Sequence, residues 1–212
     1  MSPAPVILDI VGSRRSPDRA ALQAEIHAAA EEVAEAIPPL EGLWATVGDE
    51  FQVVYRTLAE ALRATALMRL IGGGRFDCRY GIGVGDVRTI DRGPRGPIEE
   101  GPGWERARRA LEEVTRMQAH GSPWLRAWAV LDDGAPGLAA QVTAAYLTSR
   151  EHIISRLKAR EARIAAAWLA GATQTEIARA EKISQTAVSQ RLQASGGAAL
   201  AQAERVLLGG RP

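Results

Sequence analysis

The sequence predicts an α/β domain followed by a small all-helical domain, and two observations predict it. Up to about residue 135, short apolar runs that suit buried strands alternate with helical patterns, whereas from Leu138 the pattern is wholly helical. Charge divides near the same place, because residues 1–149 hold 16 basic and 20 acidic residues while residues 150–212 hold 10 and 5. We therefore predict an α/β domain at 1–135, a helical linker at 136–155 and a basic helical domain at 156–212.

The elements of the first domain follow in order from cap and breaker signals. A helix opens with Pro17-Asp18 and ends before Pro38-Pro39, and a second helix ends at Gly72-Gly73-Gly74. The segment from Asp91 to Gly103 is rich in glycine, proline and charge, which predicts a loop. The predicted helices are 17–37, 58–71 and 104–120, and the predicted strands are 6–11, 43–47, 51–55, 76–84 and 125–131, with 86–90 continuing the fourth strand past a kink at Gly85.

Two short segments each place an acid beside a glycine within a run that otherwise suits a buried strand. They are Ile7-Leu8-Asp9-Ile10-Val11-Gly12-Ser13 and Val47-Gly48-Asp49-Glu50-Phe51-Gln52. Such pairs are also ordinary turn chemistry, so neither segment alone decides the matter. Burying an ionised carboxylate costs several kcal/mol unless donors or a cation compensate it. Two such acids brought together would repel each other unless a divalent metal lay between them.

The order and residues of these segments resemble the palm domain of class III nucleotidyl cyclases and GGDEF diguanylate cyclases. Asp9-Ile10-Val11-Gly12 is similar to the first metal-binding strand, and Thr46-Val47-Gly48-Asp49 is similar to the hairpin that carries the second metal-binding aspartate. Gly48-Asp49-Glu50-Phe51 matches the end of GGDEF. The strand Arg79-Tyr80-Gly81-Ile82-Gly83-Val84-Gly85 has glycines where something must approach the backbone closely, and it resembles the cyclase strand that ends in GIxxG. With the helix that follows Gly101-Pro102-Gly103, the fuller pattern resembles the SatD family over about residues 6–115.

The resemblance implies a ferredoxin-like palm, an α/β (α+β) fold with a mostly antiparallel sheet. It implies Mg²⁺ or Mn²⁺ held by Asp9, Asp49 and the Ile10 carbonyl, with Glu50 as a further ligand. The implied nucleotide contacts are Ile10, Val11, Gly12, Ser13 and Gly48. It also implies a homodimer in which Arg108 or Arg109 of one subunit faces the acids of the other.

Two positions depart from the cyclase pattern. Ala45 stands where cyclases that use ATP carry a base-selecting lysine, and Glu105 stands where they carry a transition-state asparagine. The departures put turnover in question more than they do the binding of a nucleotide such as a nucleoside triphosphate.

The C-terminal region predicts a helix-turn-helix, with an ordinary amphipathic helical hairpin as the alternative. Thr173 and Glu176 fit a capping box, and Ala178, Ile183, Val188 and Leu192 fit the packing positions. The stretch resembles region-four-like modules of sigma factors and LuxR-type regulators, except that Lys182 stands in the turn where glycine is usual. The predicted DNA contacts, whose side chains hydrogen-bond base edges and phosphates, are Thr173, Ser184, Gln185, Thr186, Ser189, Gln190 and Arg191.

Three functional hypotheses fit these patterns. The favoured one is a DNA-binding transcriptional regulator of double-stranded DNA whose palm senses a nucleotide with Mg²⁺ or Mn²⁺. The second is an active metal-dependent nucleotidyl cyclase or transferase with a DNA-binding tail, in which the metals activate a 3′-hydroxyl and neutralise triphosphate. The third is a palm retained only as a dimerisation scaffold. One cysteine, Cys78, and the absence of an 18-residue apolar run favour a cytoplasmic protein without disulfides or a membrane span.

Overall fold

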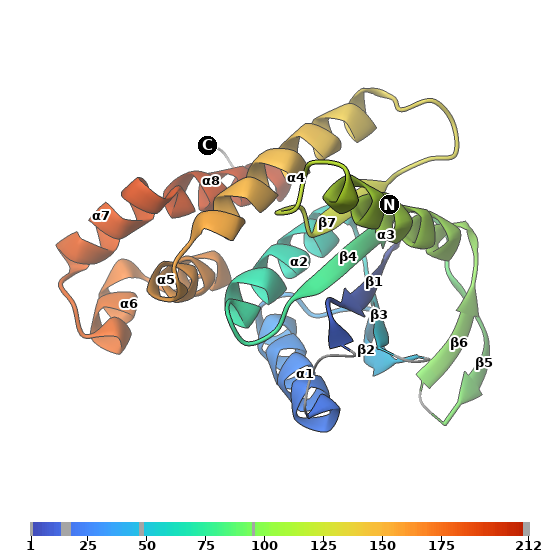
Figure 1. Ribbon diagram of the computed structural model, residues 1–212, viewed down its shortest axis with the longest axis horizontal. Helices are drawn as coiled ribbons and strands as arrows, with labels where there is room; N and C mark the ends of the chain where they lie inside the picture. Colours follow the sequence, from blue (N-terminus) through green and yellow to red (C-terminus); the bar gives the residue numbers. More distant parts are fainter. Residues whose placement is uncertain (1, 14–17, 47–48, 95, 210–212) are drawn as a thin grey trace.

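A five-stranded mixed sheet with helices on both faces forms the centre of the molecule (Figure 1). The computed structural model describes residues 2–13, 18–46, 49–94 and 96–209. The strand order is β2-β3-β1-β4-β7; the first three pairings are antiparallel and β4–β7 is parallel. Its strands are β1 (Ala4–Ile10), β2 (Glu41–Ala45), β3 (Glu50–Tyr55), β4 (Cys78–Gly83) and β7 (Ala127–Val130).

The central strand β1 is apolar on both sides because both of its faces are covered. Val6 and Leu8 belong to the main core beneath α1 (Arg19–Ala36) and α2 (Leu58–Gly72). Ile7 belongs to a second cluster beneath α3 (Pro102–Ala119). Asp9 therefore interrupts an apolar strand on the face that α3 covers.

The glycines of β4 are explained by the close approach of α3. A Cβ atom on Gly81 would collide with the backbone of Ala107, and one on Gly83 would collide with the backbone of Gly103. The sequence prediction that something approaches this strand closely is correct, and the neighbour is a helix of the same chain.

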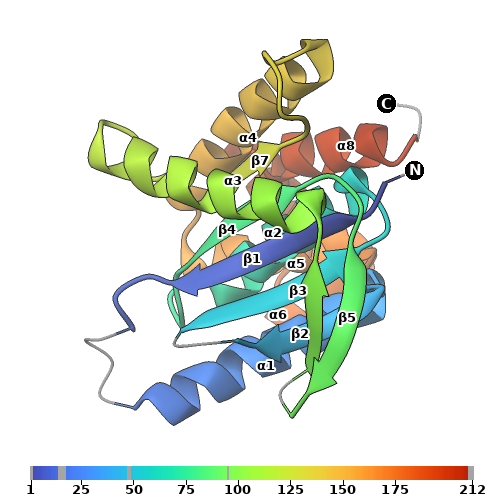
Figure 2. The same ribbon diagram turned by 90° about the vertical axis from the view of Figure 1, so that its right-hand side faces the viewer.

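A two-stranded sheet replaces the predicted loop and the predicted extension of the fourth strand. β5 (Arg88–Gly93) pairs with β6 (Gly96–Glu100) in an antiparallel hairpin that lies beside β2 in Figure 2. Cross-strand contacts of Arg88 with Glu100 and of Thr89 with Glu99 stabilise the pairing. Two of the glycines that indicated an irregular loop instead lie at the strand ends, because Gly93 ends β5 and Gly96 begins β6.

Five C-terminal helices follow the sheet domain, and the first, second and fifth of them pack against it. They are α4 (Leu138–Arg156), α5 (Ala159–Ala170), α6 (Gln174–Glu181), α7 (Gln185–Ser195) and α8 (Gly197–Leu207). Ala162, Leu169 and Leu200 are buried in the same core as the strands. The segment predicted as a linker forms most of α4, in which Arg150 and Glu151 are fully buried. Helices α4, α5 and α8 thus share one core with the sheet, whereas α6 and α7 pack around a separate small cluster. Among the helices that the described residues form, none is long and apolar enough to cross a membrane.

Candidate functional site

Two of the predicted acids lie side by side on the sheet face that α3 covers. Asp9 is the register partner of Glu50 on β3 and of Arg79 on β4. Arg79 Nη1 donates to Asp9 Oδ2 at 2.8 Å. Arg108 of α3 donates to both carboxylate oxygens of Glu50, at 2.6 and 2.7 Å. We call Asp9, Glu50, Arg79 and Arg108 the α3-face ion cluster; its four side chains are neutral in sum.

The third predicted acid, Asp49, ties the hairpin to the segment that follows β1. Ser13 Oγ donates a hydrogen bond to Asp49 Oδ2, and the Ile10 amide donates to the Asp49 carbonyl at 3.4 Å. The chain turns between them at Gly12, whose φ of 72° lies in the left-handed region that favours glycine. The local sequence thereby brings Asp49 into the neighbourhood of Asp9.

The pKa of Asp9 reflects its burial more than its charged neighbours. Its pKa is raised above the ordinary value, first because burial penalises the charged form. The hydrogen bond and charge of Arg79 oppose that rise, whereas the nearby charges of Asp49 and Glu50 add to it. The Asp9 carboxyl is thus held where burial disfavours its charged form even with Arg79 present.

The oxygen donors suit a hard divalent cation, but their present partners do not leave them arranged as a metal cage. Carboxylate and carbonyl oxygens are the ligands that Mg²⁺ and Mn²⁺ prefer. Within the described part of the chain, however, no group of three His, Cys, Asp or Glu residues is arranged to hold a metal ion. Asp9 and Glu50 are each engaged by an arginine. A cation at Asp9 would have to compete with Arg79.

The C-terminal helices form the turn geometry that the sequence predicts. Thr173 Oγ1 accepts from the Glu176 amide at 3.2 Å, and Glu176 Oε2 accepts from the Thr173 amide at 2.7 Å, which completes the capping box. Ser184 caps α7 by accepting from the Ala187 amide at 3.1 Å. Lys182 has φ 54°, and no other non-glycine residue among those described has a positive φ. The backbone of the turn is therefore left-handed, although its residue is lysine.

The two helices have a packed side and a polar side. Val188 and Leu192 of α7 are buried with Ile177 and Ala178 of α6 and with Ile164 of α5. On the polar side, Thr173, Ser184, Gln185, Thr186 and Gln190 are exposed and Ser189 and Arg191 are half-buried. All seven predicted DNA-contacting residues thus keep some exposure outside this small core.

A comparison with protein families now assigns the chain to one of them. The model of the SatD family matches residues 4–203. The chain belongs to the SatD family. Among curated proteins, none matches this sequence significantly. The resemblance noted from the sequence ended near residue 115, whereas the SatD match continues through α7 and most of α8. The match to the SatD family therefore includes the helical region of this chain.

The SatD chain brings together some predicted site residues and separates others. Arg108 reaches Glu50 within one chain, but Arg109 turns away to Asp133. Ile10 is buried, Val11 donates to the Asp77 carbonyl at 2.9 Å, and Gly12 and Ser13 form the turn beside Asp49. Gly48 lies outside the described residues.

Sequence reasoning missed two members of the site. It quoted Arg79 in the glycine-rich strand without recognising it as the partner of Asp9, and it did not name Gln118, whose Oε1 accepts from Arg79 Nε at 2.6 Å. The signal for Arg79 was available, because a period of two places it on the opposite strand face from the buried Cys78 and Tyr80.

Proposed function

We propose that this SatD-family chain is a DNA-binding transcriptional regulator that acts as a cytoplasmic homodimer. The polar face of α7, exposed beyond the left-handed corner at Lys182, is the observation that carries the proposal, since it suits a helix-turn-helix. In such motifs the second helix enters the major groove and places its first turns against base edges. Gln185 and Gln190 suit adenine, and Ser184 and Thr173, at two helix starts, suit phosphates.

The charge of this region supports a polyanionic partner. Residues 150–212 carry 10 basic and 5 acidic residues. Glu181 engages Arg160 at 3.1 Å and Arg163 at 2.9 Å, so part of the positive charge is spent on holding α6 against α5. Arg191 projects from α7 itself, where a phosphate contact would set the register of the helix on DNA.

The second part of the proposal concerns the sheet domain. The order β2-β3-β1-β4 with antiparallel pairing throughout is the order of a ferredoxin-like palm, which supports that interpretation. We propose that this palm binds a nucleotide together with Mg²⁺ or Mn²⁺ at Asp9, Asp49 and the Ile10 carbonyl. Binding requires Arg79 to release Asp9, and the released guanidinium is then free to meet phosphate.

The DNA-binding proposal is tested with the full chain, because α5 and α8 share their core with the sheet. Duplexes selected from a random library serve as the target, and affinity is measured by fluorescence anisotropy at several salt concentrations. We expect affinity to fall as salt rises. Arg191→Ala weakens binding to all duplexes, whereas Gln190→Ala costs about 1–3 kcal/mol on the selected site only.

The matched control is Gln202→Ala, an exposed glutamine on α8 outside the turn. It leaves DNA affinity unchanged. Failure to select any duplex, or equal losses in Gln190→Ala and Gln202→Ala, would refute the DNA-binding proposal.

The metal proposal is tested by titrating the chain with Mn²⁺, with and without a nucleoside triphosphate. Electron paramagnetic resonance measures the bound Mn²⁺. Asp49→Asn abolishes binding, while Arg79→Gln strengthens binding of Mn²⁺ alone because it removes the competing cation from Asp9. The control Asp133→Asn removes an exposed carboxylate that pairs with Arg106 and Arg109 away from Asp9, and it leaves Mn²⁺ binding unchanged. Unaltered Mn²⁺ binding in Asp49→Asn would contradict the assignment.

One observation favours an enzyme as the second candidate. Asp9 is the register partner of Glu50, and the Ile10 amide donates to the Asp49 carbonyl, so the three acids named by the cyclase resemblance lie on adjoining segments. Incubation with each nucleoside triphosphate and Mn²⁺, followed by chromatography of the products, separates the candidates. A cyclic or transferred product that Asp49→Asn fails to form would support the enzyme; unchanged nucleotide would support the sensor.

A further inference from the structure

A cavity lies between the sheet domain and the C-terminal helices, and no role has yet been assigned to it. Its volume is about 600 Å³, within the range typical of small-molecule sites. The end of α2, the start of β4 and the segment before β7 form one side of it. The end of α4 and the start of α5 form the other side. It is distinct from the α3-face ion cluster, none of whose residues lines it.

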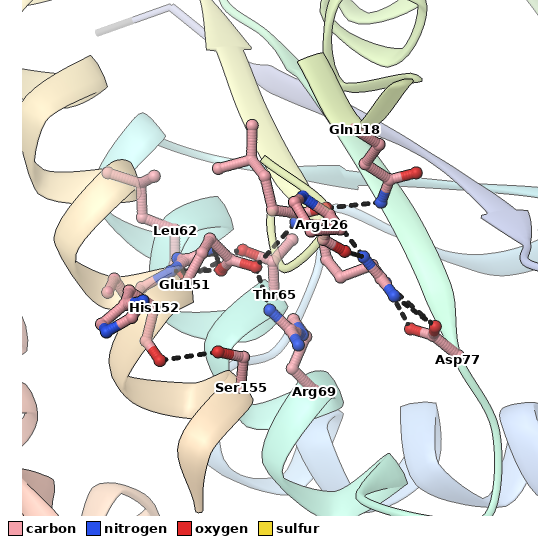
Figure 3. A network of polar contacts seen from close by, with 12 residues as sticks. Leu62, Thr65, Arg69, Asp77, Gln118, Arg126, Glu151, His152 and Ser155 are labelled. Carbon is pink, nitrogen blue, oxygen red and sulfur yellow. Dashed lines mark hydrogen bonds and ion pairs between the residues drawn. The ribbon is translucent and has the colours of Figure 1, made fainter. Parts of the chain in front are cut away.

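The wall of this cavity carries unbalanced positive charge. Arg69, Arg75 and Arg126 line it, and Asp77 is the acid among its lining residues. Asp77 forms an ion pair with Arg126, whose Nε and Nη2 donate to the Asp77 carboxylate at 2.7–2.9 Å. Figure 3 shows this pair beside the contact between Arg69 and Glu151. The lining thus has a formal charge of +2.

The acid behind the wall does not remove that excess. Glu151 lies behind Arg69, but it also accepts a hydrogen bond from Arg150 Nε at 2.9 Å, so its charge is matched by Arg150. Arg75 donates to the Ile71 carbonyl, at 2.8 Å from Nη2, rather than to a carboxylate. Its guanidinium is exposed and can turn toward an anion in the cavity. A bound anion with two negative charges would complete the balance.

The remaining walls are apolar and aromatic. Phe76 and Trp124 are half-buried at the cavity, and Leu157 and Ile154 close the side formed by α4. Trp124 is held edge-on to His152 of α4, with ring centroids 5.4 Å apart. A flat ring between such side chains gains stacking and apolar burial, while its charged group reaches the arginines.

We propose that this cavity is a binding site for a small phosphate monoester that carries one flat ring. The phosphate lies between Arg69, Arg75 and Arg126, since a monoester carries between one and two negative charges at neutral pH. Arg75, which meets a backbone carbonyl and no carboxylate, supplies the bidentate contact, whereas Arg126 contributes its charge, because its Nη1 already donates to the Pro123 and Leu125 carbonyls. The ring lies toward Trp124 and Phe76. Because the occupant touches α2 on one side and the α4–α5 junction on the other, it braces the helices that carry α6 and α7 against the sheet.

Calorimetric titration of the full chain with phenyl phosphate tests the proposal, with inorganic phosphate and phenol as probes of each half. We expect phenyl phosphate to bind. Inorganic phosphate and phenol should each bind at least about tenfold more weakly, which is the factor that corresponds to one charge-assisted hydrogen bond. Arg75→Gln lowers the affinity for phenyl phosphate by about tenfold. Trp124→Leu removes the preference for phenyl phosphate over inorganic phosphate.

Two controls separate this site from others. Arg116→Gln removes the same charge from an exposed arginine on α3 that pairs with Glu113, and it leaves binding unchanged. Asp49→Asn, which disables the proposed metal site, also leaves phenyl phosphate binding unchanged, so the two proposals fail separately. The absence of binding at millimolar phenyl phosphate, equal binding of inorganic phosphate, or equal effects of Arg75→Gln and Arg116→Gln would overturn the proposal.

Discussion

Two of the arginine–acid clusters in the described part of the chain differ chiefly in how far water reaches them. In the α3-face ion cluster, the side chains of Arg79 and Asp9 are 22% and 24% exposed. In the second cluster, which we call the α4 network and which consists of Arg69, Arg150 and Glu151, the last two side chains are 0% exposed. The two pairs therefore differ in what breaking them costs. The pair of Arg79 and Asp9 can exchange partners at small cost, whereas breaking the pair of Arg150 and Glu151 leaves a buried charge.

The residues of the α4 network also make hydrogen bonds to backbone groups of other elements. Arg150 Nη1 donates to the Leu62 carbonyl at 2.6 Å, and Glu151 Oε2 accepts from the Arg126 amide at 3.1 Å and from Arg69. It thereby joins α4 to α2 and to the segment before β7. The α3-face ion cluster has Gln118 at its border, and that residue also donates to the Leu125 carbonyl, next to Arg126. The Gln118 side chain thus connects the α3-face ion cluster to the segment that contacts the α4 network.

The largest effect is expected where the α4 network is broken. Glu151→Ala leaves Arg69 and Arg150 without their shared carboxylate, and Arg150 is fully buried. Removing one partner of a buried pair typically costs about 3–5 kcal/mol. Urea unfolding followed by circular dichroism measures the loss in free energy of unfolding. The control Glu113→Ala breaks a pair with Arg116 on the surface of α3 and changes stability little. Equal losses of unfolding free energy in Glu151→Ala and Glu113→Ala would show that the α4 network contributes no more to stability than a surface pair.

A smaller effect is expected in the α3-face ion cluster. Arg108→Gln removes the bidentate partner of Glu50, but the Arg108 side chain is 42% exposed. Water can replace much of what Glu50 loses, so the cost should be about 0.2–1 kcal/mol, the range for exposed pairs. The same urea experiment measures it, and raised salt should reduce the difference from the unmodified chain. A loss as large as that of Glu151→Ala would show that this cluster is a structural anchor too.

The sequence predicted the parts of this fold that local rules control. The capping box at Thr173, the left-handed turn at Lys182 and the close approach to the glycines of β4 each depend on a few neighbouring residues. The order of strands and helices in the sheet domain was also predictable, because apolar runs and breakers mark it. The SatD family, inferred from the residues around the two aspartates, is confirmed.

The missed features depend on partners that are distant in sequence. Arg150 and Glu151 are adjacent charged residues in a helix, a pattern that usually indicates a solvated surface, and their burial follows from Arg69 and Leu62 more than 80 positions away. The choice between Arg108 and Arg109 likewise depends on where α3 lies over Glu50. Pairing of β5 with β6 escaped prediction because glycine and proline dominate the segment. In each case the tertiary contact, and not local propensity, decides the outcome.

The smallest effect, and one of opposite sign, is expected for Asp9→Asn. Burial, together with Asp49 and Glu50, raises the pKa of Asp9 although Arg79 opposes the rise, so the folded chain holds this proton more tightly than the unfolded chain. The resulting stability is fully present below the ordinary pKa of 3.8 and is lost as pH rises through the raised value. Asparagine does not titrate and keeps an acceptor for Arg79. The variant should therefore match the unmodified chain at acidic pH and become slightly more stable above this window. Urea midpoints taken from pH 3.5 to pH 7.5 test the sign, and a variant that is less stable at pH 7.5 would contradict it. A carboxylate kept where it weakens the fold is what a binding residue, in contrast to the anchor Glu151, would show.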